Sequence, residues 1–157
     1  MSRPRGWNWV RKGYLSLAAF CMVIGAPSLF GHQVPFDSSV AARRLAAVEE
    51  KDPYRLRSLV RDGRPTLIAF IDHLCHTCLR SVGPIEKLKQ RFAGRANVVV
   101  IDPARISAAH TWAKDYYQVW FVPKFVLIGQ SGEVVREHFG PTPAETLASD
   151  LRALLAR

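Results

Sequence analysis

Cysteine is scarce in this chain, and charge of one sign forms no long run. Three cysteines occur in 157 residues, and two of them form the pair Cys75-His76-Thr77-Cys78. So little cysteine excludes a disulfide-dense mini-protein. With 48% hydrophobic and 22% charged residues, a disordered or collagen-like chain is excluded as well. No internal repeat is visible, and the length suits one globular domain with a short appendage.

Acidic residues are missing from the chain before Asp37, where four basic residues occur. These four account for +4 of the formal charge of +9, which leaves +5 on the remainder. The other basic residues are dispersed among acids, with no run longer than Arg43-Arg44. A basic groove is therefore poorly supported, and we expect a solvated surface and no nucleic-acid partner.

A charge-free segment follows the basic start and runs for 17 residues, from Tyr14 to Phe30. The positive-inside rule keeps the N-terminus in the cytoplasm and sends the rest of the chain across a membrane. Seventeen apolar residues are at the short limit for a span, and Ala26-Pro27-Ser28 offers a cleavage site. Residues 1–31 are therefore predicted to be a signal peptide or a membrane anchor, and both alternatives stay open.

Beyond this segment, the hydrophobic pattern predicts a βαβ unit, a helix, a β-hairpin and a final helix. Two short helices over 39–50 and from Asp52 form a helical lead-in or linker at 32–58, and the main domain follows at 59–157. Strands are expected at 66–71, 97–101, 125–128 and 134–139, with helices at 75–92 and 107–117. Thr142-Pro143-Ala144-Glu145 has the pattern of a capping box for the last helix.

Cys75 and Cys78 come directly after a buried strand and at the start of a long predicted helix. The free N–H groups and dipole at a helix start favour negative charge, so a thiol there loses its proton more easily. We expect Cys75, at the exposed start, to attack a partner's disulfide. Cys78, one turn further and more buried, would resolve the mixed disulfide.

Two other interpretations of the cysteine pair, a zinc site and a purely structural disulfide, are less well supported than the redox role. A structural zinc site normally uses four Cys or His ligands, and the sequence has no second Cys-x-x-Cys. A disulfide with a structural role alone would close so short a loop that it removes little entropy from the unfolded chain.

The strand-CxxC-helix arrangement, followed by Phe121-Val122-Pro123 before a hairpin, resembles the thioredoxin superfamily. The match covers about residues 59–155 and implies a thioredoxin-like α/β fold, with a mixed central sheet flanked by helices. Together with the hydrophobic segment upstream, the stretch GRPTL at 63–67 resembles membrane-anchored thioredoxin-like proteins of cyanobacteria and chloroplast thylakoids. That resemblance implies a thiol reductase facing the lumen or periplasm, with a role in cytochrome assembly.

The resemblance also implies roles around the two cysteines. Pro123 matches the family's cis-proline, and the backbone of Val122 would pair with the substrate chain. His76 and Thr77, between the cysteines, are expected to contact the same substrate. A trans proline that starts an edge strand is the alternative, because few X-Pro bonds in folded proteins are cis. No metal and no cofactor are expected at this site.

Three positions depart from the family pattern. Ala69 replaces the usual buried acid, Leu74 replaces a tryptophan, and Val98 stands where a lysine is common. A buried carboxylate would assist proton transfer at the resolving thiol, so its absence puts fast turnover in doubt. Pro84, preceded by Gly83, falls one residue later than is common in the family, so we expect a kink or bulge there.

The preferred function is an extracytoplasmic thiol-disulfide oxidoreductase that reduces exported proteins, recycled by a membrane electron donor. Two alternatives remain open: a Cu(I)-binding metallochaperone that uses the two thiolates with His73 or His76, and a redox-silent interaction module. Sequence gives neither the redox direction, nor the substrates, nor the oligomeric state.

Overall fold

The computed structural model describes residues 35–105 and 108–157. The signal peptide or anchor expected over residues 1–31 lies outside these ranges. Within them, no helix is both long and apolar enough to cross a membrane.

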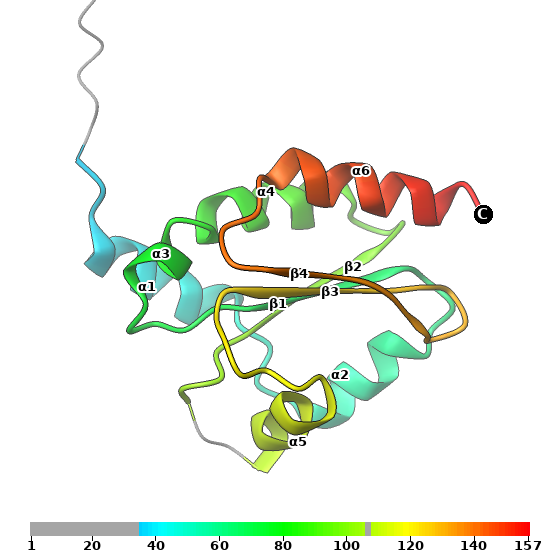
Figure 1. Cartoon of the computed structure of the whole chain (residues 1–157), viewed down its shortest axis with the longest axis horizontal. Helices are drawn as coiled ribbons and strands as arrows, with labels where there is room; N and C mark the ends of the chain where they lie inside the picture. Colours follow the sequence, from blue (N-terminus) through cyan, green and yellow to red (C-terminus); the bar gives the residue numbers. More distant parts are fainter. Residues whose placement is uncertain (1–34, 106–107) are drawn as a thin grey trace, which may run out of the picture. The chain divides into compact units, whose positions relative to one another are not determined.

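The described residues form six helices and four strands, in the order α1-α2-β1-α3-α4-β2-α5-β3-β4-α6 (Figure 1). The helices are α1 (Ser38–Val48), α2 (Pro53–Val60), α3 (His76–Leu79), α4 (Val82–Arg91), α5 (Ala108–Tyr116) and α6 (Ala144–Leu155). The strands are β1 (Thr66–Phe70), β2 (Asn97–Ile101), β3 (Lys124–Ile128) and β4 (Val134–Phe139). The expected order of a βαβ unit, a helix, a hairpin and a helix is confirmed.

The four strands form one mixed sheet in the order β2-β1-β3-β4. β1 pairs parallel with β2, as the predicted βαβ unit requires, and antiparallel with β3. β3 and β4 form the predicted hairpin, with a bulge between Leu127 and Ile128. β4 is the last strand on its side among the described residues, and each of its residues is exposed or half-buried.

Helices cover both faces of this sheet. Every residue of β1, β2 and β3 is buried, which explains why these strands are nearly continuous apolar runs. One hydrophobic cluster, here called the main core, lies between the sheet and α1, α3, α4 and α6. A second cluster lies between the opposite face and α2 and α5. Figure 1 shows α4 and α6 on one side of the sheet and α2 and α5 on the other.

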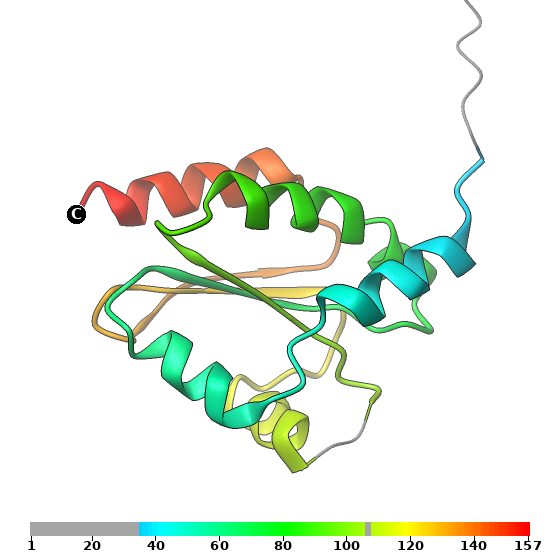
Figure 2. The same ribbon diagram turned by 180° about the vertical axis from the view of Figure 1, so that it is seen from behind.

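The helical lead-in packs with the rest of the domain. Ala41 and Leu45 of α1 are buried in the main core. Arg44 of α1 forms an ion pair with Glu86 of α4, and these helices lie next to each other in Figure 2. After α1, Glu49 forms a parallel bridge to β2. Residues Phe36–Arg157 consequently form one compact unit.

The long helix expected over residues 75–92 is interrupted. It consists of α3 and α4, with a break at Arg80 and Ser81. Pro84 is the third residue of α4, where its missing N–H costs no intrahelical hydrogen bond. The irregularity expected near Gly83 and Pro84 is present, and it lies slightly before them.

The predicted capping box of the last helix is wrong. Pro143 is the N-cap of α6, and no side chain caps its first N–H groups. The hydroxyl of Thr142 donates to the carbonyl of Gly140 at 3.2 Å. The carboxylate of Glu145 accepts a hydrogen bond from Arg91 of α4 at 2.9 Å. Both side chains form hydrogen bonds with other groups and do not cap the first N–H groups of α6.

Tyr117, which follows α5, is buried in the second cluster, and its ionisation provides a test of the fold. Its ring contacts Phe70 of β1, and burial, with a smaller effect of Tyr116, raises its pKa to about 12 from 10.0. Between these pH values the tyrosine ionises only when unfolded, so stability present below pH 10 should fall as pH rises. The loss should reach about 2–3 kcal/mol. Denaturant unfolding across this pH range measures it.

The matched comparison uses two phenylalanine variants. Tyr117→Phe should remove this part of the alkaline loss, whereas Tyr54→Phe, at a position 78% exposed, should keep it. Equal pH dependence in the wild type and Tyr117→Phe would contradict the prediction.

Candidate active site

Cys75 and Cys78 lie at the start of α3 and are joined by a disulfide, with their Cα atoms 5.2 Å apart. Cys75 is the N-cap residue, and its sulfur accepts the backbone N–H of Cys78 at 3.2 Å. The same N–H can donate to a Cys75 thiolate once the disulfide is reduced, which favours the ionised form. Cys78 is fully buried in the main core, and Cys75 is partly exposed. This difference in exposure is the one expected from sequence.

The ends of three strands meet beside this pair. β1 and β2 are parallel and in register, so they end together. β3 is antiparallel and pairs Lys124 with Phe70, which brings Pro123 to the same end of the sheet. The Val122–Pro123 peptide bond is cis, as the resemblance implied. Pro123 is buried and Val122 is partly exposed.

Both residues between the cysteines are exposed. The ring of His76 contacts Phe36 edge-on, with ring centroids 5.1 Å apart, and the Arg80 guanidinium lies 5.5 Å from the Phe36 centroid. Phe36 precedes α1, so the lead-in reaches the cysteine motif, a contact that sequence reasoning missed. Thr77 lines a cleft of about 450 Å³ between α3, α4 and the loop before α6.

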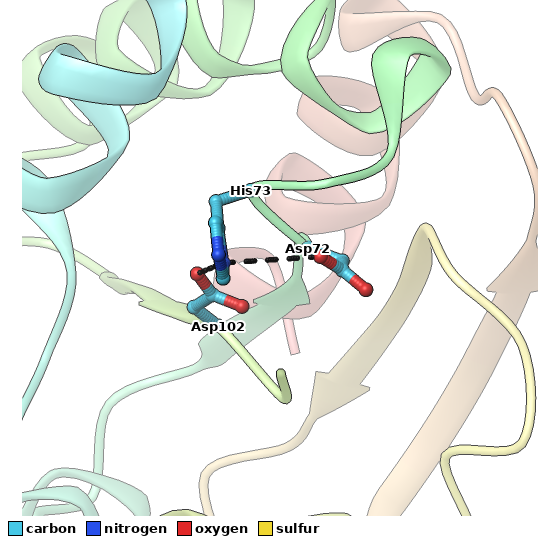
Figure 3. A group of neighbouring side chains, drawn as sticks. All are labelled: Asp72, His73 and Asp102. Atoms are coloured by element: carbon cyan, nitrogen blue, oxygen red, sulfur yellow. Dashed lines mark hydrogen bonds and ion pairs between the residues drawn. The ribbon is translucent and has the colours of Figure 1, made fainter. Parts of the chain in front are cut away.

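A histidine and a buried aspartate lie at the same end of the sheet. Asp102 directly follows β2, its side chain is fully buried, and its Oδ2 lies 2.7 Å from Nδ1 of His73. Figure 3 shows the His73 ring directed toward Asp102, with Asp72 nearby. Asp102 also accepts hydrogen bonds from the backbone of Ala104 at 3.0 Å and from Arg105 Nε at 3.2 Å. Sequence reasoning missed Asp102, although an acid directly after a buried strand is a usable signal.

Asp72 has a local structural role. Its Oδ1 accepts the backbone N–H of Leu74 at 2.7 Å and so caps the loop before α3. Leu74 is 79% exposed, and Trp120 and Phe121, just before the cis-proline, are 78% and 75% exposed. Large apolar side chains thus flank both the cysteine motif and the proline loop. Contact with a partner chain here would be favourable, because it would remove this apolar surface from water.

Lys124 is the least expected residue of the site, because it is charged and yet only 2% exposed. Its Nζ donates to the carbonyls of Tyr117 at 2.5 Å and Gln118 at 3.4 Å. It also pairs with Glu137 of β4 at 2.9 Å. Lys124 directly follows Pro123, and its hydrogen bonds to Tyr117 and Gln118 therefore connect the two ends of the loop that contains the cis-proline.

Two of the three departures from the family pattern, Ala69 and Val98, lie in the main core. Ala69 is fully buried in the same cluster as Cys78, and Val98 is 6% exposed there. Neither side chain can carry a proton.

In the described part of the chain, one group of three residues has the donor atoms for a metal ion: Asp72, His73 and Asp102. These atoms lie within 4.8 Å of one another, and neither cysteine sulfur belongs to the group. Asp102 already bonds to His73 and to the Arg105 guanidinium, whose positive charge opposes a cation. The Cu(I) alternative stays a prediction that titration of the reduced protein would test.

Two curated relatives are similar in sequence. A thiol:disulfide interchange protein TxlA homolog from Synechocystis sp. is 26% identical over 103 residues, which is 64% of this chain and 55% of the relative. Thiol:disulfide interchange protein TxlA from Synechococcus elongatus is 28% identical over 119 residues, or 74% and 59% of the two chains. The chain thus spans less than two thirds of either relative. No family model matches the sequence.

Solved structures show the same fold. Oxidised mitochondrial thioredoxin 3 from Saccharomyces cerevisiae aligns with a TM-score of 0.58 and 19% identity, covering 71% of this chain and 99% of that one. Chloroplastic thioredoxin z also aligns with a TM-score of 0.58, at 18% identity, covering 70% of this chain and 96% of that one.

Proposed function

We propose that this chain, which has the fold of thioredoxins, is a thiol-disulfide oxidoreductase whose working groups are Cys75 and Cys78. The observation that carries the proposal is the Cys75–Cys78 disulfide, with one sulfur partly exposed and the other buried. The names of the two curated relatives support the same activity.

The geometry supports a two-step exchange. The Cys75 thiolate attacks a substrate disulfide, forms a mixed disulfide and releases one substrate thiolate. The Cys78 thiolate then attacks the Cys75 sulfur, so the Cys75–Cys78 bond forms and the second substrate thiolate leaves. Two electrons pass from the protein to the substrate. Reduction of Cys75–Cys78 by a donor dithiol restores the starting state.

Substrate contacts are proposed for four residues besides the cysteines. The partly exposed backbone of Val122, beside cis-Pro123, would pair with the substrate chain. His76 and Thr77 would face the same chain, because both are exposed between the cysteines.

Location and direction belong to the same proposal. The basic start followed by 17 uncharged residues supports export of the domain to the periplasm or a thylakoid lumen. We expect reduction of exported proteins there, including those of cytochrome assembly, with a membrane protein as the electron donor. The protein would be anchored if residues 1–31 are retained and secreted if they are cleaved.

Replacement of Cys78 tests this proposal directly. Cys78→Ser keeps the attacking sulfur and removes the resolving one, so mixed disulfides with substrates should accumulate on Cys75. We expect them as reductant-sensitive, higher-mass species on gels after native expression and acid quenching. The double variant Cys75→Ser/Cys78→Ser is the matched control and should capture nothing. Equal yields from both variants, or none from either, would contradict the proposal.

A further inference from the structure

A pocket of about 230 Å³, here called the α2–α5 pocket, lies between α2, α5 and the turn that joins β3 to β4. These two helices are neighbours on the face of the sheet opposite to the main core (Figure 1). β3 begins beside Phe70 and ends beside Thr66, so the turn lies at the end of the sheet remote from Cys75. The residues that line the pocket are Arg57, Val60, Arg61, Trp112, Tyr116, Tyr117, Ser131 and Gly132.

Two arginines give this pocket its charge. Arg57 and Arg61 are four residues apart at the end of α2, a spacing that places side chains on one helix face. Both are exposed, and neither guanidinium forms an ion pair or a hydrogen bond within the part of the chain that the structure describes. The lining contains no acidic side chain. Like charges at this spacing repel each other, so an anion bound between them would be stabilised.

The other arginines of this segment have partners. Arg55 of α2 pairs with Glu50 at 3.3 Å, and Arg64 pairs with Asp62. The Asp62 carboxylate, next to Arg61 in the sequence, also accepts a hydrogen bond from the Asn97 side chain at 3.0 Å. The positive charge that faces the α2–α5 pocket is therefore not neutralised by these acids and is available to a ligand.

Aromatic rings orient one of the two guanidinium groups. The guanidinium carbon of Arg57 lies 4.3 Å from the centroid of the Trp112 ring. Trp112 is stacked on Tyr116, with centroids 5.5 Å apart, and contacts the buried Tyr117 edge-on. Stacking covers one face of a guanidinium and leaves its in-plane N–H donors available. Those donors match the two oxygens of a carboxylate, which can bind in a bidentate manner.

The size and composition of the pocket favour a polypeptide ligand. Pockets for small molecules usually measure about 300–1,000 Å³, whereas this pocket has room for one or two side chains. Arginine, tryptophan and tyrosine are also the residues that most often dominate binding at protein interfaces. Tyr116 is 64% exposed, so its ring can contact the apolar part of an incoming side chain.

We propose that the α2–α5 pocket binds the carboxylate side chains of an acidic segment of a partner protein. One carboxylate of the segment bonds the oriented guanidinium of Arg57, and a second bonds Arg61. This interaction goes beyond thiol-disulfide exchange and does not depend on it. Because the pocket and Cys78 lie on different faces of the sheet, the partner can stay bound while the cysteine pair reacts.

Binding of short labelled peptides to the purified full chain tests the proposal. Hexaglutamate with blocked ends should bind, and the neutral hexaglutamine should not, as measured by fluorescence anisotropy. The double variant Arg57→Gln/Arg61→Gln loses both charged donors, so its affinity for hexaglutamate should fall at least about tenfold. The affinity of the wild type should decrease as the salt concentration rises.

A charge-matched variant controls for non-specific attraction. Arg43→Gln/Arg55→Gln removes the same charge from exposed positions of α1 and α2 outside the pocket, and its affinity should stay within about twofold of the wild type. Tyr116→Ala should weaken binding several-fold, which a purely electrostatic attraction would not produce. Turnover of a small aromatic disulfide should be unchanged in Arg57→Gln/Arg61→Gln, which also shows that this variant is folded.

The outcomes separate this inference from its alternatives and from the proposed function. Failure of the wild type to bind hexaglutamate, equal affinities of the wild type and Arg57→Gln/Arg61→Gln, or an equal loss in the charge-matched variant would overturn it. Binding of inorganic phosphate or of phosphatidylglycerol vesicles that depends on these arginines, without binding of hexaglutamate, would overturn it too. A wild-type protein without disulfide turnover would overturn the proposed function and leave the peptide result unaffected.

Discussion

Replacing Cys75 with serine is expected to lower the rate of disulfide exchange by at least about 1,000-fold. A serine hydroxyl stays protonated near neutral pH and cannot form a mixed disulfide, so both steps are lost. Cys75 is the partly exposed member of the pair, and Cys78 alone is buried away from a protein substrate. Turnover of a small aromatic disulfide and of a peptide disulfide, with an excess of dithiol, measures the effect.

The third cysteine provides the control for this experiment. Cys21 lies in the uncharged N-terminal segment, outside the described residues, and no redox role is expected for it. Cys21→Ser should therefore retain wild-type turnover. If Cys75→Ser kept its activity, the exchange chemistry would not depend on the pair at α3.

Replacing Lys124 with alanine is expected to reduce the free energy of unfolding by about 3 kcal/mol. The ammonium group bonds two backbone carbonyls, of Tyr117 and Gln118, and pairs with Glu137. Its removal leaves the buried carbonyl groups without this donor, and loss of the aliphatic stem leaves a space beside the cis-proline. Urea unfolding of purified variants measures the change.

Two variants separate the causes. Lys124→Met keeps most of the stem and loses the charge, so it isolates the polar contribution. Lys114→Ala, at an exposed position of α5, should change stability by less than about 0.5 kcal/mol. A Lys124→Ala protein as stable as the wild type would show that the carbonyls find other donors.

The sheet could be predicted because its strands are buried on both faces. Thr66–Phe70 and Asn97–Ile101 are apolar runs between glycine, proline and polar turn residues, and such runs have few alternatives to a central strand. Helix ends were harder to predict, because local pattern competes with tertiary contacts. Thr142 and Glu145 have the spacing of a capping box, yet Arg91 of a different helix holds Glu145.

The candidate site was predictable only where its residues are close in sequence. The cysteine motif and the proline before the hairpin each form a recognisable local pattern. His73 and Asp102 are 29 positions apart, and only the parallel register of β1 and β2 brings them together. Lys124 illustrates the converse, since a lysine is normally expected in solvent. The backbone carbonyls that accept its hydrogen bonds belong to a turn whose conformation could not be predicted from the sequence.

The exposed edge of β4 has a consequence for the behaviour of the protein in a crowded compartment. An unpaired strand edge invites another chain to add to the sheet, which begins aggregation. Here the outer strand has charged Arg136 and Glu137 in its centre, and the bulge at Leu127 and Ile128 interrupts the register of the hairpin. Both features hinder the addition of another chain to this edge of the sheet.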